Sequence, residues 1–153
     1  MLSIDPLMLN NAPQSLADDP NLIRARARLL LRTLEKVELW NSDREESKRI
    51  LGRDISGQMN ISAIGLMGHS RGGGATRLAA NMLMTPERLG FKEITNWPSK
   101  LKSRIEAVFD VAPADSPEGG KDVTVVGLPW GLMAAGCEND EIDYGESTAC
   151  FKL

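Results

Sequence analysis

The sequence is poor in the side chains that bind transition metals or form disulfide bridges. Its 153 residues include one histidine, His69, and two cysteines, Cys137 and Cys150. A metal site of the cysteine and histidine type needs more ligands than these three positions offer. Two cysteines also make no disulfide-dense scaffold. We therefore expect no metal ion and no cofactor.

Long hydrophobic runs and an excess of basic charge are also missing. No apolar run approaches the length that crosses a bilayer, and residues 1–13 lack the basic start and apolar centre of a signal peptide. The net charge of −3 gives no concentrated basic surface for nucleic acid. What is present is ordinary, since hydrophobic residues make up 42% and charged residues 25%. This composition and length predict one globular domain over residues 1–153 and leave the oligomeric state and the compartment open.

An amphipathic helix is predicted from Pro20 to Trp40. Asp19 precedes Pro20 as an acidic N-cap before a proline at the first helical position. Apolar residues then recur at spacings of four and three, which places on one face Ile23, Ala27, Leu30, Leu34 and Val37. A second, short helix is predicted around residues 45–51.

Three short apolar runs predict strands, at residues 61–67, 105–111 and 123–135. The stretch from Ala75 to Met84 between the first two reads as a helix that ends before Pro86. Strands that alternate with helices are typical of a mostly parallel sheet with crossover helices. The sequence therefore predicts an α/β fold.

The segment Gly68-His69-Ser70-Arg71-Gly72 has the form G-x-S-x-G and lies between a predicted strand and a predicted helix. A serine at the apex of so tight a turn has a strained backbone, and we expect Gly68 and Gly72 to stand where side chains would collide. Ser70 then exposes its hydroxyl as a nucleophile. The amide of Arg71, at the positive end of the helix, can donate to an oxyanion.

Two other interpretations of this segment remain open. It can be a glycine-rich turn that only lets a helix and a strand approach closely. It can also be a phosphate-binding loop, although it lacks the lysine of a Walker A loop and the phase of G-x-G-x-x-G.

A serine nucleophile needs a histidine as its base and an acid that orients the histidine. On a strand–turn–helix scaffold of this type the acid follows a later strand, which favours Asp140, with Asp115 and Asp143 as alternatives. Each of the three can equally be a solvated loop carboxylate. No histidine follows Asp140, and His69 is expected to point away from Ser70 and to pack beneath or beside the turn. The chain by itself therefore cannot assemble a Ser-His-Asp triad.

Residues 64–82, with their centre at 68–74, resemble the nucleophile elbow of serine hydrolases of the α/β-hydrolase fold. The likeness is greatest to the branch with polyester hydrolases and cutinases, dienelactone hydrolases and platelet-activating-factor acetylhydrolase-like enzymes. Residues 137–140 are similar to the acid loop of that branch, which implies Asp140 as the triad acid. The resemblance implies a small or polymeric carboxylic ester as the substrate.

The family carries strands before the elbow helix, and a loop there donates a second oxyanion amide. It also carries the triad histidine on a loop after the last strand. Because neither part is found, we expect the sequence to be the middle of a larger hydrolase, a partial α/β-hydrolase domain without its N-terminal strands and C-terminal histidine loop. The histidine would then come from outside this chain.

The resemblance also bears on the cysteines, because Cys137 and Cys150 enclose the loop of Asp140. A disulfide bridge between them would hold that loop and would agree with a secreted full-length protein, whereas two free thiols are the alternative. A second function class is a truncated or degenerate hydrolase that is not catalytic and at most binds a partner.

Overall fold

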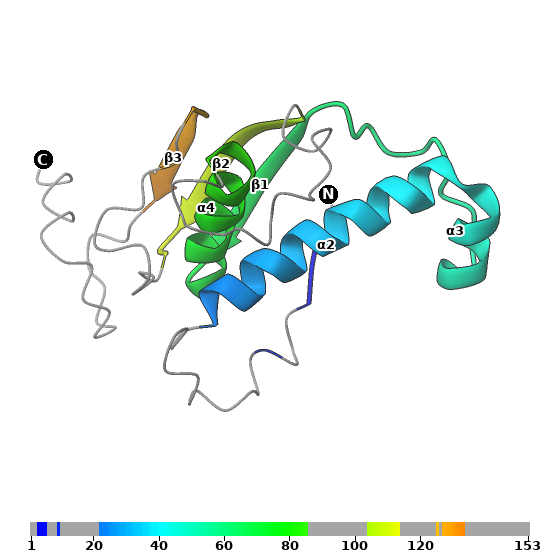
Figure 1. The fold of residues 1–153 in the computed structure, drawn as a ribbon, viewed down its shortest axis with the longest axis horizontal. Coiled ribbons are helices and arrows are strands. Elements are labelled where there is room, and N and C mark those ends of the chain that lie inside the picture. Colours follow the sequence, from blue (N-terminus) through cyan, green and yellow to red (C-terminus); the bar gives the residue numbers. More distant parts are fainter. Residues whose placement is uncertain are drawn as a thin grey trace, which may run out of the picture.

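The computed structural model describes residues 3–5, 9, 22–85, 104–113, 125 and 127–133. The elements in chain order are α2 (Ile23–Ser42), α3 (Arg44–Leu51), β1 (Ile64–His69), α4 (Arg71–Met84), β2 (Ile105–Val111) and β3 (Trp130–Met133). The strands form one sheet in the order β1-β2-β3, and both pairs are parallel (Figure 1). The predicted α/β class with a parallel sheet is therefore confirmed. Within the described ranges no helix is long and apolar enough to span a bilayer.

Helix α2 begins at Ile23, three residues later than the predicted start at Pro20. Leu22 takes the N-cap position with a left-handed backbone (φ 52°) and no side-chain cap, so the prediction of Asp19 as the cap is wrong. Leu22 is almost completely buried, and its burial against the core fixes where the chain turns into the helix. The buried face also differs from the predicted one, because Leu31 is buried where Leu30 was expected and Arg26 is buried as well. A spacing of four from Ala27 keeps Leu31 on the same face, so the pattern alone did not separate the two.

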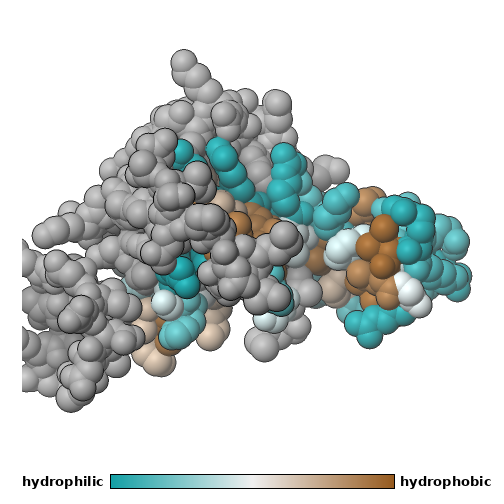
Figure 2. Space-filling view, turned by 90° about the horizontal axis from the view of Figure 1, so that it is seen from below, coloured by the Kyte–Doolittle hydropathy of each residue, from teal (hydrophilic) through white to brown (hydrophobic). Residues whose placement is uncertain are grey.

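Helix α3 confirms the helix predicted around residues 45–51. The side chain of Asp43 caps it by accepting hydrogen bonds from the amides of Glu45 and Glu46, and Gly52 ends it in a left-handed conformation. The helix lies at the end of α2 that is far from the sheet (Figure 1). Figure 2 shows hydrophilic residues around a small hydrophobic area at this end of the molecule.

Strand β1 and helix α4 are both displaced from their predicted ranges. Residues 61–63 are not part of the strand, because the side chain of Asn60 accepts hydrogen bonds from the amide and hydroxyl of Ser62 and forms a turn there. The strand instead runs on through Gly68 to His69. Helix α4 begins at Arg71 rather than Ala75, so the three glycines at 72–74 lie in its first turn.

The third apolar run is a strand only from Trp130 to Met133. Gly127 has a positive φ of 74°, and Pro129 has no amide to donate, so the described residues before Trp130 do not join the sheet as a strand. The carbonyl of Pro129 still accepts a hydrogen bond from the amide of Val108. The predicted strand over residues 123–135 was therefore too long at its start.

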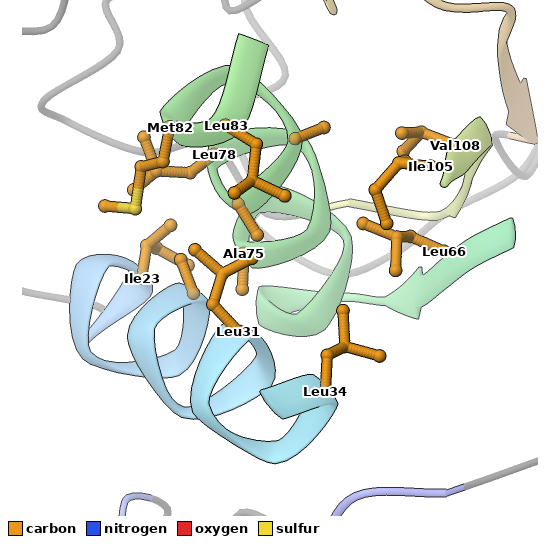
Figure 3. Packing of buried hydrophobic residues seen from close by; sticks show 13 residues of the cluster. Ile23, Leu31, Leu34, Leu66, Ala75, Leu78, Met82, Leu83, Ile105 and Val108 are labelled. Atoms are coloured by element: carbon orange, nitrogen blue, oxygen red, sulfur yellow. The ribbon is translucent and has the colours of Figure 1, made fainter. Parts of the chain in front are cut away.

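The hydrophobic core lies between α2, α4 and one face of the sheet (Figure 3). Helix α4 is buried on nearly all sides because α2 covers it on one side and the sheet on the other, which explains why Ala79, Ala80 and Met82 have no exposed area. Leu66 and Val108 point into this core from the sheet (Figure 3).

The opposite face of the sheet carries exposed hydrophobic side chains. Met67 is 68% exposed, Phe109 38% and Met133 55%. Met67 and Phe109 alternate along their strands with buried residues, so they point away from α4. Met133 lies two residues after Gly131, the partner of Phe109, and so shares their face. A parallel sheet is normally covered on both faces. In the ranges that the structure describes, only one face has a helix on it.

Candidate functional site

Ser70 lies between the last residue of β1 and the first residue of α4, as the motif predicts. Its backbone has φ 54° and ψ −126°, a conformation that side-chain-bearing residues rarely adopt. Its amide donates to the carbonyl of Val111 at 3.0 Å, which ties the turn to the end of β2. The side chain makes no capping hydrogen bond to the helix. Ser70 is therefore a partly exposed residue at the end of β1, and within the described ranges its hydroxyl makes no hydrogen bond to the helix that follows.

The two motif glycines do not have the same steric role. A Cβ at Gly68 would collide with the carbonyl group of Gly72, so Gly68 is required for this turn as predicted. A Cβ at Gly72 would meet nothing within 4 Å, so the predicted collision there is wrong. The close approach on the helix side is instead at Gly73, whose Cβ would lie 2.7 Å from that of Pro113.

The first turn of α4 offers amide groups beside Ser70. The amide of Gly73 donates back to the Ser70 carbonyl at 2.9 Å. The amide of Arg71, the first of the helix, has no acceptor within the described ranges. A free amide at a helix N-terminus is suited to bind a negatively charged oxygen, because the helix dipole adds to the hydrogen bond. Whether Arg71 serves an oxyanion stays a prediction.

His69 is exposed at the end of β1, and the prediction that it packs against the turn is wrong. It follows the alternation of β1 and shares the open face of the sheet with Met67. Within the described part of the chain, no hydrogen bond joins His69 to Ser70. His69 lines the same trough as Ser70, and the expectation that it is no base for this serine stays a prediction.

An open trough of about 1310 Å³ runs from the elbow along β1 and α2. Ser70, Arg71 and Gly72 line one end of it. The rest of the lining is mixed. Its apolar part includes Leu30, Leu34, Val37, Ile55, Met59, Ile61 and Ile64, and its polar part includes Arg26, Glu38, Arg53, His69 and Arg104. A ligand with an apolar part could therefore lie in the trough with a reactive group near Ser70.

Several predicted site residues lie outside the described residues. They are Asp140, its alternatives Asp115 and Asp143, and the cysteines Cys137 and Cys150. Their roles as triad acid and as a disulfide pair stay predictions. In the described ranges, no group of three or more histidine, cysteine, aspartate or glutamate residues is arranged to hold a metal ion.

A buried polar cluster, which the sequence analysis missed, lies behind the elbow. Asp110 of β2 has no exposed area. Its Oδ1 accepts from the hydroxyl of Thr76 at 3.1 Å, its Oδ2 accepts from Nε1 of Trp130 at 2.9 Å, and Nε of Arg77 lies 2.9 Å from Oδ2. Burial raises the pKa of Asp110, although all three partners oppose the rise. A carboxylate inside the apolar run 105–111 was the signal that could have revealed the cluster.

Comparison of the chain with protein-family models, with curated proteins and with solved structures found no match.

Proposed function

We propose that this chain is part of a serine hydrolase with a partial α/β-hydrolase fold, acting on carboxylic esters through Ser70. The observation that carries the proposal is the backbone of Ser70, held at φ 54° and ψ −126° between a parallel strand and a helix. A strained serine at that place presents its hydroxyl above the sheet. The collision that excludes any side chain at Gly68 supports the same interpretation.

In the proposed reaction, the hydroxyl of Ser70 attacks the ester carbonyl while a histidine from outside this chain takes its proton. The negative charge that forms on the carbonyl oxygen is stabilised by the amide of Arg71. The histidine, oriented by Asp140, then gives the proton to the departing alcohol and leaves an acyl-enzyme. Water, deprotonated by the same histidine, releases the acid and restores Ser70.

The trough supports an ester whose acyl or alcohol part is apolar. Aliphatic side chains such as Leu30, Leu34 and Val37 form part of its lining beside the charged Arg26 and Glu38, and it is open to solvent. Burial of an aliphatic chain contributes about 0.8 kcal/mol for each methylene group removed from water. We therefore expect esters of medium-chain acids to be better substrates than acetates, whether they are small molecules or segments of a polymer.

A fluorophosphonate probe tests the proposal, because it labels only an activated serine. We expect the wild-type chain to be labelled at Ser70, faster when free imidazole is added as a substitute base, and Ser70→Ala to remain unlabelled. Ser62→Ala is the matched control, since Ser62 is an exposed serine in a turn before β1 and should not affect labelling. A folded sample that stays unlabelled at every imidazole concentration would contradict the proposal.

The exposed position of His69 supports a second candidate function. Since no hydrogen bond joins this histidine to Ser70 in the described residues, the chain can be a non-catalytic hydrolase fragment that at most binds a partner. The same labelling experiment separates the two candidates. An unlabelled, folded chain that nevertheless binds an apolar ester analogue in the trough would favour the second.

A further inference from the structure

The end of strand β2 and the two residues after it contact the turn that contains Ser70. The carbonyl of Val111 accepts the hydrogen bond from the amide of Ser70 at 3.0 Å. Pro113 lies so close to Gly73 that a Cβ there would be 2.7 Å away. The amide of Ala112 donates to the carbonyl of Met133 at 2.7 Å, which fixes the same segment to β3. The backbone of Ser70 is therefore placed by residues 111–113.

Asp110 immediately precedes residues 111–113 and connects them to helix α4. Its carboxylate binds Thr76 and Arg77, which lie in the second turn of α4, and Trp130, the first residue of β3. The hydroxyl of Thr76 also lies 2.8 Å from the carbonyl of Gly73, so its one proton is shared between the carboxylate and the first turn of the helix. One buried side chain of β2 thus connects α4, which follows Ser70, with β3.

The carboxylate of Asp110 can orient its neighbours as well as pack against them. A buried carboxylate is costly unless it is paired, and an apolar residue would join α4 to the sheet without that cost. Hydrogen bonds are directional, however, whereas apolar contacts are not. The carboxylate can therefore fix the rotation of α4 about its axis and the height of Val111 relative to Ser70.

We propose that Asp110 is a positioning residue for Ser70, setting the Ser70 hydroxyl and the Arg71 amide in register through α4 and the end of β2. The inference rests on the proposed hydrolase function, because it assigns the two groups to one reaction. A nucleophile and an oxyanion donor act together only when they are held to within a fraction of an ångström.

The test uses the full chain with Asp110→Asn, which keeps the size of the side chain and one carbonyl acceptor but removes the charge. We expect the rate of Ser70 labelling and kcat for a nitrophenyl ester to fall at least tenfold per folded molecule, with KM changed less than threefold. Asp54→Asn is the matched control, because Asp54 is an aspartate that binds Ser56 and Arg44 away from the elbow. It should leave both rates unchanged. Equal kcat per folded molecule in Asp110→Asn and the wild type would overturn the proposal.

Two further measurements cover the cases where Asp110→Asn does not fold or the wild type is inactive. Thr76→Ser keeps the hydroxyl and should be labelled at the wild-type rate. Thr76→Val has no hydroxyl and should be labelled more slowly. Equal labelling rates in the two variants would contradict the proposal. Amide hydrogen exchange at Ser70 needs no activity. We expect it to quicken at least tenfold in Asp110→Asn and not in Asp54→Asn. If the wild type stays unlabelled even with imidazole as the substitute base but this difference appears, the hydrolase function fails while the positioning of Ser70 stands. If no difference appears, the positioning fails.

Discussion

Two regions of the molecule are organised by aspartates. The two aspartates differ in their exposure to solvent and in how far along the chain their partners lie. Around α3, Asp43 accepts hydrogen bonds at 3.0 Å from amides two and three residues ahead of it in the chain. Beneath the elbow, Asp110 binds Trp130 and Thr76, which are 20 and 34 residues away. The first aspartate is exposed and the second has no exposed area.

The difference separates local structure from tertiary structure. The region of α3 is held by contacts that form as the helix forms, including the pair of Glu46 with Arg49. The contacts of Asp110 need α4, β2 and β3 to be in place before any of them exists. We therefore expect substitutions around α3 to have small and local effects, whereas substitutions beneath the elbow should affect the whole fold.

The largest effect is expected for Asp110→Ala. It leaves the guanidinium of Arg77, whose side chain is 9% exposed, buried without its carboxylate. Removing one partner of a buried ion pair costs about 3–5 kcal/mol. Urea unfolding of the variant measures the loss as a lower midpoint.

Asp54→Ala is the control for this variant. Asp54→Ala removes an aspartate whose ion pair with Arg44 is exposed, and its effect should be far smaller. Replacing both Asp110 and Arg77 by leucine should recover part of the loss, because the guanidinium that lost its carboxylate is then removed as well. If Asp110→Ala and Asp54→Ala were equally stable, the contrast between the regions would be wrong.

The next effect concerns the glycines of the elbow. Gly68→Ala forces a Cβ against the carbonyl group of Gly72 and should destabilise the protein by about 1–3 kcal/mol. Gly72→Ala meets open space in the first turn of α4 and should stabilise it by up to about 1 kcal/mol. Thermal unfolding of the two variants should therefore shift in opposite directions. A shift of the same sign and size would show that the elbow does not have the described geometry.

A smaller effect is expected at the cap of α3. Asp43→Ala removes the acceptor of the amides of Glu45 and Glu46 and should cost about 1 kcal/mol. Asp43→Asn keeps an acceptor oxygen and should cost much less. Helix content by circular dichroism and the urea midpoint measure both variants. An alanine variant as stable as the asparagine variant would mean that the cap contributes nothing.

The same comparison explains which parts of the structure were predictable. Helix α3, the parallel sheet and the placement of Ser70 between a strand and a helix all follow from patterns within a few residues, and the sequence predicts them correctly. The role of Gly68 follows for the same reason, because the glycine and the carbonyl it would strike are four positions apart.

Several of the failures depend on distant contacts, whereas the late starts of β1 and β3 have local causes in the turn of Asn60 with Ser62 and in Gly127 with Pro129. The start of α2 is set by the burial of Leu22, and the steric demand in the first turn lies at Gly73 because Pro113 approaches it from another element. The cluster of Asp110 was missed because its partners are spread over α4 and β3. No local pattern reports which of several charged residues will meet in a core.

The smallest effects should appear in acid, and they have opposite signs in the two regions. Hydrogen bonds from Arg49 lower the pKa of Glu46 below the ordinary 4.5, so its contribution to stability is present above 4.5 and is lost as the pH falls through the lowered value. Burial raises the pKa of Asp110 above the ordinary 3.8, so stability from this group falls as the pH rises from 3.8 through the raised value.

The two effects can be separated by measuring unfolding free energies at pH values above and below the two shifted pKa values. The proteins to compare are the wild type, Glu46→Gln and Asp110→Asn. On acidification the stability of the wild type should fall relative to Glu46→Gln, because the variant has no charge to lose there. The stability of the wild type should rise relative to Asp110→Asn, because protonation removes the charge of the buried carboxylate, and the asparagine of the variant has no such charge. The Glu46 difference should also shrink in high salt, since that pair is exposed, while the Asp110 difference should not. Two differences with the same sign would mean that the carboxylate of Asp110 is stabilised by its partners more than it is penalised by burial.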